Sequence, residues 1–576
     1  MNSVPACIFS ALLLLASVSA QQAPPAAAVP PQTPTAPATH AQATTAQQGY
    51  RIAGVVVNSL TGQPVASASV AIAPVTRGTE RDFSQSVMTG ADGHFAFATL
   101  TRGKYSLAAT ARGYSLQSFD RHDAYASAIA VGPDLDSEHL VFRLQPDASI
   151  EGNVTDENND PVQYAMVRLF QTNIEDGVRK TVSVNQAQTD DQGHYHIGHL
   201  EPGAYYLAVA ARPWYAQNVR GSRNPPSPES SSPQAGQDDA SLDVTYPLTF
   251  YPDVTDSAAA TPLQLTPGDR ETADLVMRAV PSLHLRIHTG ATAQSAVLGR
   301  MIFPRVSQRL FDGYLESAYN SPTSWVAPGV IEISGLSPGH YVIEIPPSTG
   351  ANDKSNSRGW YREIDLTGDA DLSASEGPAF ATITGTILFE DSRVPDHSLI
   401  QLMNPDTGET FSNEISPNGT FEFNSNNVRA GRYLVTLGTP QRFYLKKLVA
   451  TGARMVGRTL EVGPGSSVHL AAIAARGAGR VDGTVLRDGQ PFAGAMVVLV
   501  PQDPANNSPL FRRDQSDSDG TFTLSNIVPG PYTVIAIANG WNLEWGNPAV
   551  LQPYLKHGEI VQVPAEGKLQ VKVQVQ

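Results

Sequence analysis

The chain of 576 residues has almost no cysteine: Cys7 is the single one. It lies in the opening stretch MNSVPACIFSALLLLASVSA, where an apolar run from Ile8 to Ala16 and a Val-Ser-Ala ending predict a secretory signal peptide over residues 1–20. After removal of this peptide the chain has no thiol, which excludes disulfides, thiol catalysis and zinc bound by cysteine. An exported chain of this kind must gain its stability from packed cores and short loops.

Long apolar runs and an excess of positive charge are absent as well. No stretch approaches the ~18 consecutive apolar residues of a membrane-spanning helix, so no transmembrane span is expected. The net charge of -15 disfavours nucleic acid and anionic membrane surfaces as partners. Residues 21–49 lack apolar periodicity and are dense in Pro, Ala, Gln and Thr, which predicts a disordered linker.

The rest of the sequence contains a repeat. Five copies of a Gly-x-Tyr motif are spaced at intervals of about one hundred residues, with their tyrosines at Tyr105, Tyr205, Tyr341, Tyr433 and Tyr532. The second interval is longer because of a low-complexity insertion over 217–243. The repeat predicts five domains, with boundaries at 50–147, 148–280, 281–378, 379–476 and 477–576.

Each unit has the pattern of short strands joined by turns. Four units open with an apolar-x-Gly-x-apolar strand, centred on Gly54, Gly152, Gly385 and Gly483. Strands led by Pro and aromatic strands that follow a turn glycine come next, and no helical periodicity is present. Alternation with a period of two and turns about every ten residues predict an all-β chain of antiparallel sandwiches.

The order of these motifs resembles the carboxypeptidase regulatory-like domain: Gly-x-Val, Pro-Val-x-x-Ala-x-Val, Asp-x-x-Gly-x-Phe/Tyr, then Leu-x-Pro-Gly-x-Tyr. The resemblance implies a seven-stranded, prealbumin-like Greek-key sandwich, a fold also grouped with carbohydrate-binding-like domains. Units one, two and five match well, unit four departs at its second strand, and the degenerate unit three keeps little beyond 336–341. This module is attached to peptidases, outer-membrane receptors and surface proteins alike, so it indicates fold and not function.

Catalytic signals are missing or are explained by the repeat. Zinc carboxypeptidases carry a His-x-x-Glu pair, and no His of this chain has Glu three residues later. The string Gly335-Leu336-Ser337-Pro338-Gly339 fits a hydrolase nucleophile elbow, but the proline after Ser337 favours extended geometry and the string matches the ordinary repeat turn. We therefore expect a protein that is not an enzyme and needs no cofactor.

Four aromatic residues are candidates for ligand binding. Tyr114, Trp214 and Trp541 each lie nine residues after a repeat tyrosine, and Trp545 follows in the same loop as Trp541. An aromatic ring beside polar groups in a loop can stack on a sugar ring or a peptide strand. Alternatively, the same residues cap the open end of a core or pack on the next domain.

Metal sites are expected to be absent, with two reservations. The stretch GHYHIGHLEPGAYYLAV places His194, His196 and His199 close in sequence, which could hold a transition metal. Alignment with the other units instead turns Tyr195 and Ile197 inward and leaves the histidines on a solvated strand face. Acidic runs at 156–160 and 514–519 could hold a structural calcium ion, although Asp-rich turns are also common for backbone reasons.

These features together predict a non-catalytic exported protein, periplasmic or extracellular, with a binding or spacing role at the cell envelope. Its expected partner is a glycan or a protein surface, gripped weakly at several sites. Two alternatives remain open. The chain could be a purely structural stalk or scaffold, or the accessory subunit of a separate peptidase, glycoside hydrolase or outer-membrane receptor.

Overall fold

A computed structural model describes residues 49–75, 85–217, 240–288, 304–311, 313–318, 321–327, 329–345, 359–373, 377–390, 393–423, 427–439 and 443–576. The predicted signal peptide, almost all of the predicted linker and most of the predicted insertion lie outside these residues. No helix within the described part of the chain has the length and apolar character needed to cross a membrane.

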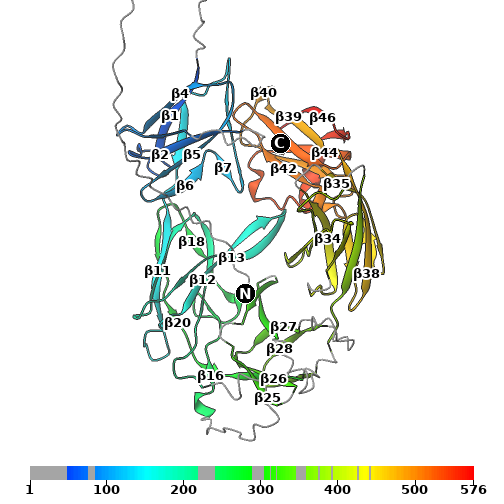
Figure 1. Cartoon of the computed structure of the whole chain (residues 1–576). Helices are drawn as coiled ribbons and strands as arrows, with labels where there is room; N and C mark the ends of the chain where they lie inside the picture. Colours follow the sequence, from blue (N-terminus) through cyan, green and yellow to red (C-terminus); the bar gives the residue numbers. More distant parts are fainter. Residues whose placement is uncertain are drawn as a thin grey trace, which may run out of the picture. The chain divides into compact units, whose positions relative to one another are not determined.

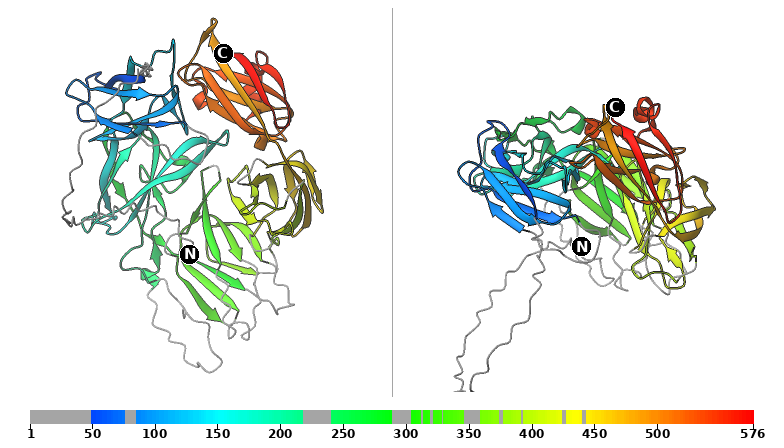
Figure 2. Two further views of the ribbon diagram at one scale, coloured as in Figure 1. Left: turned by 45° about the horizontal axis from the view of Figure 1, so that its top comes forward. Right: turned by 90° about the horizontal axis from the view of Figure 1, so that it is seen from above.

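The described chain is all-β, with paired sheets around separate hydrophobic cores (Figure 1, Figure 2). Five large clusters of buried side chains lie within residues 52–144, 148–277, 285–372, 381–474 and 481–573. We call the corresponding parts sandwich 1 to sandwich 5. The predicted fold class, a tandem array of β-sandwiches, is confirmed.

Sandwich 1 contains the strands β1 (Tyr50–Asn58), β2 (Ser69–Pro74), β3 (Gln85–Met88), β4 (His94–Leu100), β5 (Gly103–Ala111), β6 (Tyr114–Ser118), β7 (Arg121–His122), β8 (Tyr125–Ala126), β9 (Ile129–Val131) and β10 (Leu140–Leu144). Sandwich 2 contains the strands and 3-10 turns β11 (Ala148–Thr155), β12 (Met166–Glu175), β13 (Val178–Gln188), β14 (His194–Leu200), β15 (Gly203–Ala210), η1 (Ala240–Leu242), β16 (Val244–Thr245), β17 (Thr249–Phe250), η2 (Ser257–Ala259), β18 (Leu263–Leu265), β19 (Arg270–Thr272), β20 (Leu275–Val276) and β21 (Val280–Pro281).

Sandwich 3 contains β22 (Leu283–His288), β23 (Arg305–Leu310), β24 (Tyr314–Ser317), β25 (Thr323–Ala327), β26 (Val330–Leu336), β27 (Gly339–Ile345), β28 (Trp360–Leu366) and β29 (Ala370–Ser373). Sandwich 4 contains β30 (Thr382–Phe389), β31 (Leu399–Met403), β32 (Thr410–Glu414), β33 (Thr420–Glu422), β34 (Gly431–Gly438), β35 (Phe443–Thr451), β36 (Arg454–Val456), β37 (Thr459–Val462) and β38 (Ser467–Arg476).

Sandwich 5 contains β39 (Gly479–Arg487), β40 (Gln490–Pro491), β41 (Met496–Pro501), η3 (Ser508–Leu510), β42 (Arg512–Gln515), β43 (Thr521–Ile527), β44 (Gly530–Ile537), η4 (Gly540–Asn542), the helix α2 (Pro548–Leu555), β45 (Glu559–Val563) and β46 (Lys568–Gln574). The short helix α2 was not predicted, because eight residues show no helical periodicity. Asn547 caps its first turn, and Leu551 is buried in a second, smaller core on the outer face of the β41–β44 sheet.

The first strand of every sandwich pairs in parallel with a strand at or near the end of that sandwich; in sandwich 2 these partners are β19 and β20, which β21 follows. The pairs are β1 with β10, β11 with β19, β22 with β29, β30 with β38, and β39 with β46. The other pairings within the five sandwiches are antiparallel apart from β11 with β20, which extends the parallel pairing in sandwich 2, and an isolated parallel bridge between Ala536 and Val575. The opening strand of each sandwich thus has one parallel neighbour in otherwise antiparallel sheets, and local turn patterns do not reveal it because a parallel pair needs a long crossover.

The glycine in the opening strand is required by close packing. In sandwich 5, Gly483 lies opposite Phe522, and a Cβ atom at Gly483 would come within 2.4 Å of the Phe522 ring and 2.7 Å of the Val571 carbonyl oxygen. Gly385 has the same relation to Phe421, at 2.1 Å. The inward aromatic ring of one strand thus covers the glycine of its neighbour, which explains why the two motifs recur together.

The repeat tyrosine closes each unit with a hydrogen bond. In all five sandwiches its buried hydroxyl group donates to the carbonyl oxygen four residues earlier, over 2.8–3.0 Å. Burial raises the pKa of Tyr205 to about 12, so the hydroxyl group keeps the proton that it donates. We call this turn, which the tyrosine hydroxyl group fixes by its hydrogen bond to the backbone, a structural corner. Tyrosines fix turns in the same way in other β-sandwiches.

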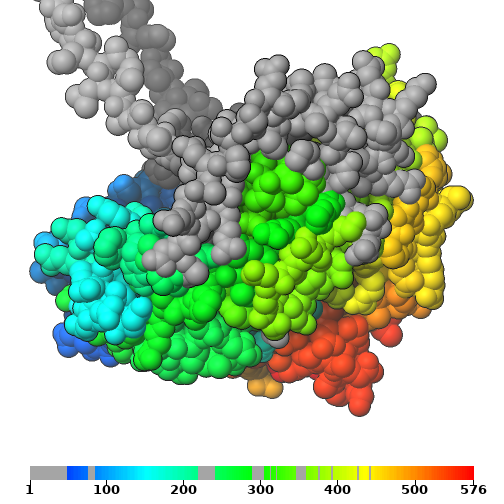
Figure 3. Space-filling model, turned by 90° about the horizontal axis from the view of Figure 1, so that it is seen from below, coloured from blue at the N-terminus to red at the C-terminus, as the bar shows by residue number. Residues whose placement is uncertain are grey.

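Sandwiches 2 and 3 share a small core of their own. Phe170 of β12 packs against Phe250 and against Phe311 and Tyr314 of sandwich 3, with ring centroids 5.4–6.4 Å apart. Figure 3 shows residues of sandwich 2 in cyan to green and residues of sandwich 3 in green to yellow-green. Apolar contact between consecutive sandwiches restricts their relative motion.

Candidate functional site

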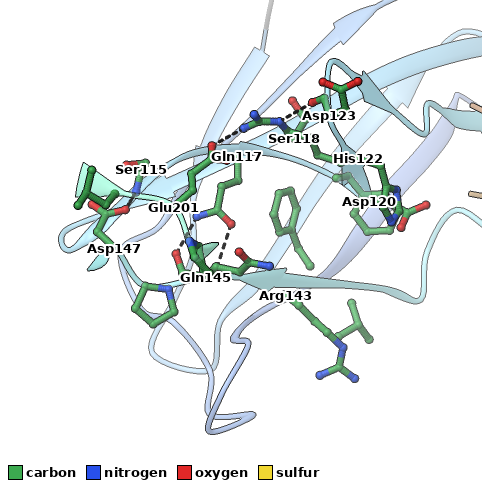
Figure 4. Close-up of a pocket in the computed structure, with 17 residues that line it drawn as sticks. Ser115, Gln117, Ser118, Asp120, His122, Asp123, Arg143, Gln145, Asp147 and Glu201 are labelled. Carbon is green, nitrogen blue, oxygen red and sulfur yellow. Dashed lines mark hydrogen bonds and ion pairs between the residues drawn. The ribbon is translucent and has the colours of Figure 1, made fainter. Parts of the chain in front are cut away.

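A cleft of about 610 Å³ lies between sandwich 1 and the turn that precedes β15 in sandwich 2. Its walls come from residues 115–123, which include most of β6 and all of β7, from residues 141–147 at and after β10, and from residues 200–202 (Figure 4). The volume falls in the range of ~300–1,000 Å³ that is usual for small-ligand sites.

Several charged groups of the cleft pair with one another and join the two sandwiches. The Arg121 guanidinium donates from Nη1 to Glu201 Oε1 over 2.7 Å. The Asp147 carboxylate accepts the backbone N–H of Ser115 at 2.6 Å, and its other oxygen lies 2.7 Å from His199 Nδ1. These pairs hold the walls together and leave few charges for a ligand.

Besides these pairs, the cleft is lined by the charged or titratable residues Asp120, His122, Asp123 and Arg143 and by several neutral polar groups. Gln117 bridges the backbone of Gln145, donating to its carbonyl oxygen at 2.7 Å and accepting its N–H at 2.9 Å. Within the described residues, no hydrogen bond engages the side-chain amide of Gln145 or the hydroxyl groups of Ser115 and Ser118. Figure 4 shows Gln117 and Gln145 side by side in the cleft, and the partly exposed ring of Phe119 lies among the lining residues.

Tyr114 lies directly before the cleft but does not line it. It begins β6, and its ring packs against the core of sandwich 1. Its hydroxyl group accepts a hydrogen bond from Asn58 Nδ2 at 2.9 Å. Ligand binding by Tyr114 stays a prediction, although this packing favours the alternative in which the residue caps a core.

Trp214 is the candidate whose side chain is exposed to solvent. Its side chain is 90% exposed and meets the ring of Tyr215 edge-on, with centroids 5.7 Å apart. The Tyr215 hydroxyl group donates to Glu157 Oε1 at 3.4 Å. A fully exposed tryptophan adds nothing to core burial, so a stacking role for Trp214 stays a prediction.

Trp541 and Trp545 lie where sandwich 5 meets sandwich 1. The Trp541 indole stacks on the His122 ring, with centroids 5.0 Å apart and planes 9° apart, and its Nε1 donates to the Gly494 carbonyl oxygen. Trp545 packs against Phe511 and the Arg513 guanidinium. The structure therefore uses these two rings in contacts within the chain, and ligand binding by them stays a prediction.

The three candidate histidines do not converge. His194 Nδ1 lies 4.0 Å from Asp190, His196 Nδ1 lies 3.5 Å from Glu151, and the partner of His199 is Asp147. Tyr195 and Ile197 point into the core, at 1% and 3% exposure, so the predicted orientation of this strand is confirmed. In the described part of the chain, no group of three or more His, Cys, Asp or Glu residues has the arrangement of a metal site.

The carboxylates of the two acidic runs bind other groups of the chain. Asp156 accepts the backbone N–H groups of Asn158 and Asp160 at 2.8 and 2.9 Å, which closes its own loop. In the second run, the Lys104 ammonium group of sandwich 1 contacts Asp517 and lies 3.6 Å from Asp519. A lysine thus takes the position that the sequence offered to a calcium ion, and calcium binding stays a prediction.

Ser337 occupies the repeat turn, as its sequence indicates. It is buried, its hydroxyl oxygen lies 3.3 Å from the Tyr341 hydroxyl group, and its carbonyl oxygen accepts the Tyr341 hydrogen bond. These contacts are the structural corner of sandwich 3. They account for Ser337 without a nucleophilic role.

Sequence reasoning missed the residues that line the cleft. Gln117 and Gln145 belong to no motif, and only proximity in the fold brings them together. One signal of the contact was present in the sequence, a charged residue at a turn position that is uncharged in other units. Glu201 lies four residues before Tyr205, and the equivalent residues of sandwiches 1 and 5 are Thr101 and Val528. A lone charge at a variable turn position does not reveal its partner, because Arg121 is 80 residues away in the sequence.

Comparisons with known proteins support the domain type and leave the function open. Residues 51–144 and 149–229 match the family described as the carboxypeptidase regulatory-like domain. No curated protein matches the sequence. Solved structures with some likeness include the minor pilin GBS52 of Streptococcus agalactiae, at 13% identity and TM-score 0.21, covering 40% of this chain and 97% of that one.

Two further likenesses are weaker. The Bacillus anthracis TIE protein is 13% identical, with TM-score 0.15, covering 71% of this chain and 69% of that one. The RrgB pilus protein of Streptococcus pneumoniae is 9% identical, with TM-score 0.13, covering 75% of this chain and 98% of that one. At such values these likenesses carry no argument about what this chain does.

Proposed function

Starting from two carboxypeptidase regulatory-like domains at residues 51–144 and 149–229, we propose that the protein is a non-catalytic, exported binding protein of the cell envelope. Its ligand is a glycan, held in the cleft between sandwiches 1 and 2. One observation carries this proposal. Apart from Arg143, most charged groups of the cleft contact other groups of the chain, whereas an amide, two hydroxyl groups and the partly exposed face of an aromatic ring remain available.

This set of groups suits a neutral sugar. Amides and hydroxyl groups both donate and accept hydrogen bonds, as the hydroxyl groups of a sugar do, so the Gln145 amide, Ser115 and Ser118 can match them in pairs. The face of an aromatic ring packs against the apolar face of a sugar ring, a role open to Phe119. A strongly charged ligand would instead compete with the Arg121–Glu201 pair that joins the walls.

The test is a binding screen of the purified chain against cell-wall and surface glycans, followed by calorimetry on the ligand found. Replacing Gln145 by Ala removes an amide that has no partner among the described residues, so the Kd should rise at least tenfold while the fold is kept. Gln63→Ala is the matched control, because Gln63 is exposed on the same sandwich and lies outside the cleft. An absence of binding to any glycan, or a Kd unchanged by Gln145→Ala, would refute the proposal.

The scaffold alternative is favoured by a different observation. Trp541 stacks on His122 of sandwich 1, and Trp545 packs against Phe511 within sandwich 5, so contacts within the chain engage two of the four candidate binding residues. On that alternative, Trp541→Ala lowers stability and no glycan binds at any site. The same screen therefore separates the two functions.

A further inference from the structure

We infer that sandwich 5 carries a docking surface for sandwich 1 of the same chain, and that this contact fixes one wall of the cleft. The surface consists of Arg513, the turn 515–520 and Trp541, and its partner is the segment 120–131. The inference deepens the proposed function, because it assigns a positioning role to residues outside the cleft.

Backbone hydrogen bonding is the first observation. The Ala128 N–H donates to Asp517 Oδ1 at 2.8 Å, the Ser518 N–H donates to the Ala128 carbonyl oxygen at 3.0 Å, and the Ala130 N–H donates to Ser518 Oγ at 2.8 Å. The turn of sandwich 5 thereby pairs with the chain at the start of β9, whose other neighbour is β5. This resembles the addition of a strand to a sheet edge.

The same turn behaves differently in sandwich 2. There the equivalent residue, Asp190, accepts the N–H groups of Gln192 and His194 from its own turn, at 3.0 and 2.8 Å. In sandwich 5, Asp519 accepts the Thr521 N–H at 3.1 Å, as Asp92 and Asn418 do at the same turn position of sandwiches 1 and 4, and this leaves Asp517 to bind sandwich 1. The turn of sandwich 5 is thus adapted for contact with another domain.

A buried amide makes the surface dependent on its partner. Gln515 is 2% exposed, and its Nε2 donates to the Asp120 carbonyl oxygen at 2.6 Å and to Ser127 Oγ at 2.8 Å. Both acceptors belong to sandwich 1. A buried amide without partners is costly, so the position of Gln515 makes sense only when sandwich 1 is docked.

Charge and aromatic stacking complete the surface. The Arg513 guanidinium is 7% exposed, pairs with the Asp123 carboxylate, and lies over the rings of Tyr125 and Trp545 at 4.7 and 4.9 Å. Arginine held between a carboxylate and aromatic faces is a common centre of binding energy at protein interfaces. Sandwich 2 adds a separate contact, because the Gly546 N–H donates to the Gly177 carbonyl oxygen at 2.9 Å.

The docked segment is also a wall of the cleft. Asp120, His122 and Asp123 line the cleft and contact sandwich 5, while Arg121 between them reaches Glu201 of sandwich 2. Three sandwiches therefore meet at residues 120–123. Release of sandwich 5 would free this wall without removing any cleft residue.

A disulfide tests the contact without any ligand. With Cys7 changed to Ser, the pair Ala128→Cys and Ser518→Cys is introduced into the full chain. The hydrogen bond between these residues places their Cα atoms at most about 7 Å apart, within reach of a disulfide. We expect an intramolecular bond in a monomer, seen by mass spectrometry, whereas Ala128→Cys with Ser508→Cys gives none. A bond only between chains, or no bond, overturns the inference.

Hydrogen exchange tests the positioning role. In Arg513→Ala, exchange of residues 120–131 should rise at least tenfold while the strands β41 and β44 keep their protection, and Arg454→Ala should leave both unchanged. Unchanged exchange of 120–131 refutes the inference whether or not a glycan is known. If the proposed glycan binds, Arg513→Ala also lowers the affinity for that glycan, although Arg513 does not line the cleft.

Discussion

Four titratable side chains form a network around a buried carboxylate of sandwich 3, and this carboxylate gives a quantitative prediction. Glu332 of β26 is 0% exposed; its Oε1 lies 3.2 Å from His284 Nδ1, and its Oε2 accepts Arg286 Nε at 2.8 Å. The second ring nitrogen of His284 lies 2.7 Å from Asp243. Hydrogen bonds from His284 and Arg286, opposed by burial, lower the pKa of Glu332 from 4.5 to about 2.

The size of the effect follows from that pKa. Each unit of difference between the folded and unfolded pKa corresponds to ~1.4 kcal/mol, so ionised Glu332 contributes about 3 kcal/mol to stability at neutral pH. Because the folded pKa is depressed, this contribution is present above pH ~4.5 and is lost as the pH falls towards about 2. Glu332→Gln removes the charge with little change of shape and should cost about 3 kcal/mol at pH 7.

Urea unfolding, followed by tryptophan emission, measures this loss of stability in Glu332→Gln. Two of the five tryptophans, Trp325 and Trp360, are buried in sandwich 3 and report on its unfolding. Hydrogen exchange assigns the change to β22 and β26. The difference between wild type and Glu332→Gln should shrink as the pH falls from 5 to 2. The control Glu461→Gln removes an exposed partner of Arg454 and should change stability by less than ~0.5 kcal/mol. A difference below ~1 kcal/mol at pH 7, or one independent of pH, would refute the reasoning.

Two further predictions concern the repeat itself. Gly483→Ala places a Cβ atom against Phe522 and should destabilise sandwich 5 by ~1–3 kcal/mol in thermal unfolding, whereas Gly463→Ala, with open space around it, should stay within ~0.5 kcal/mol. Equal effects of the two would contradict the packing argument. Tyr205→Phe removes the hydrogen bond to the Glu201 carbonyl oxygen and should cost ~1 kcal/mol in urea unfolding; no loss would show that the corner is not held by its hydroxyl group.

Local patterns predicted much of each sandwich. The alternation around Tyr195 indicated which side chains face the core, and the motifs at Gly483 and Phe522 each marked a strand. Such features depend on residues a few positions apart or on one close strand pair. The parallel pairing of first and last strands was beyond this reasoning, since β39 and β46 are brought together by the whole of sandwich 5.

The candidate site was much harder to predict. Trp541 was recognised as a loop aromatic, but its stacking partner His122 lies more than four hundred residues earlier, and nothing in either motif indicates the other. The acidic run around Asp517 matched part of a calcium loop, and the structure supplies Lys104 instead. A positively charged side chain therefore lies at this run, and calcium binding there stays a prediction.

The sequence by itself determined the repeat, the all-β fold class and the residues that face each core, because these follow from backbone geometry and apolar periodicity within about a hundred residues. The tertiary structure alone decided which surfaces remain open. Contacts between sandwiches cover Trp541 and Gln515, leave Trp214 exposed, and create the cleft at Gln145. Surface pairing depends on complementary groups far apart in the chain, and such pairs leave no local periodic signal.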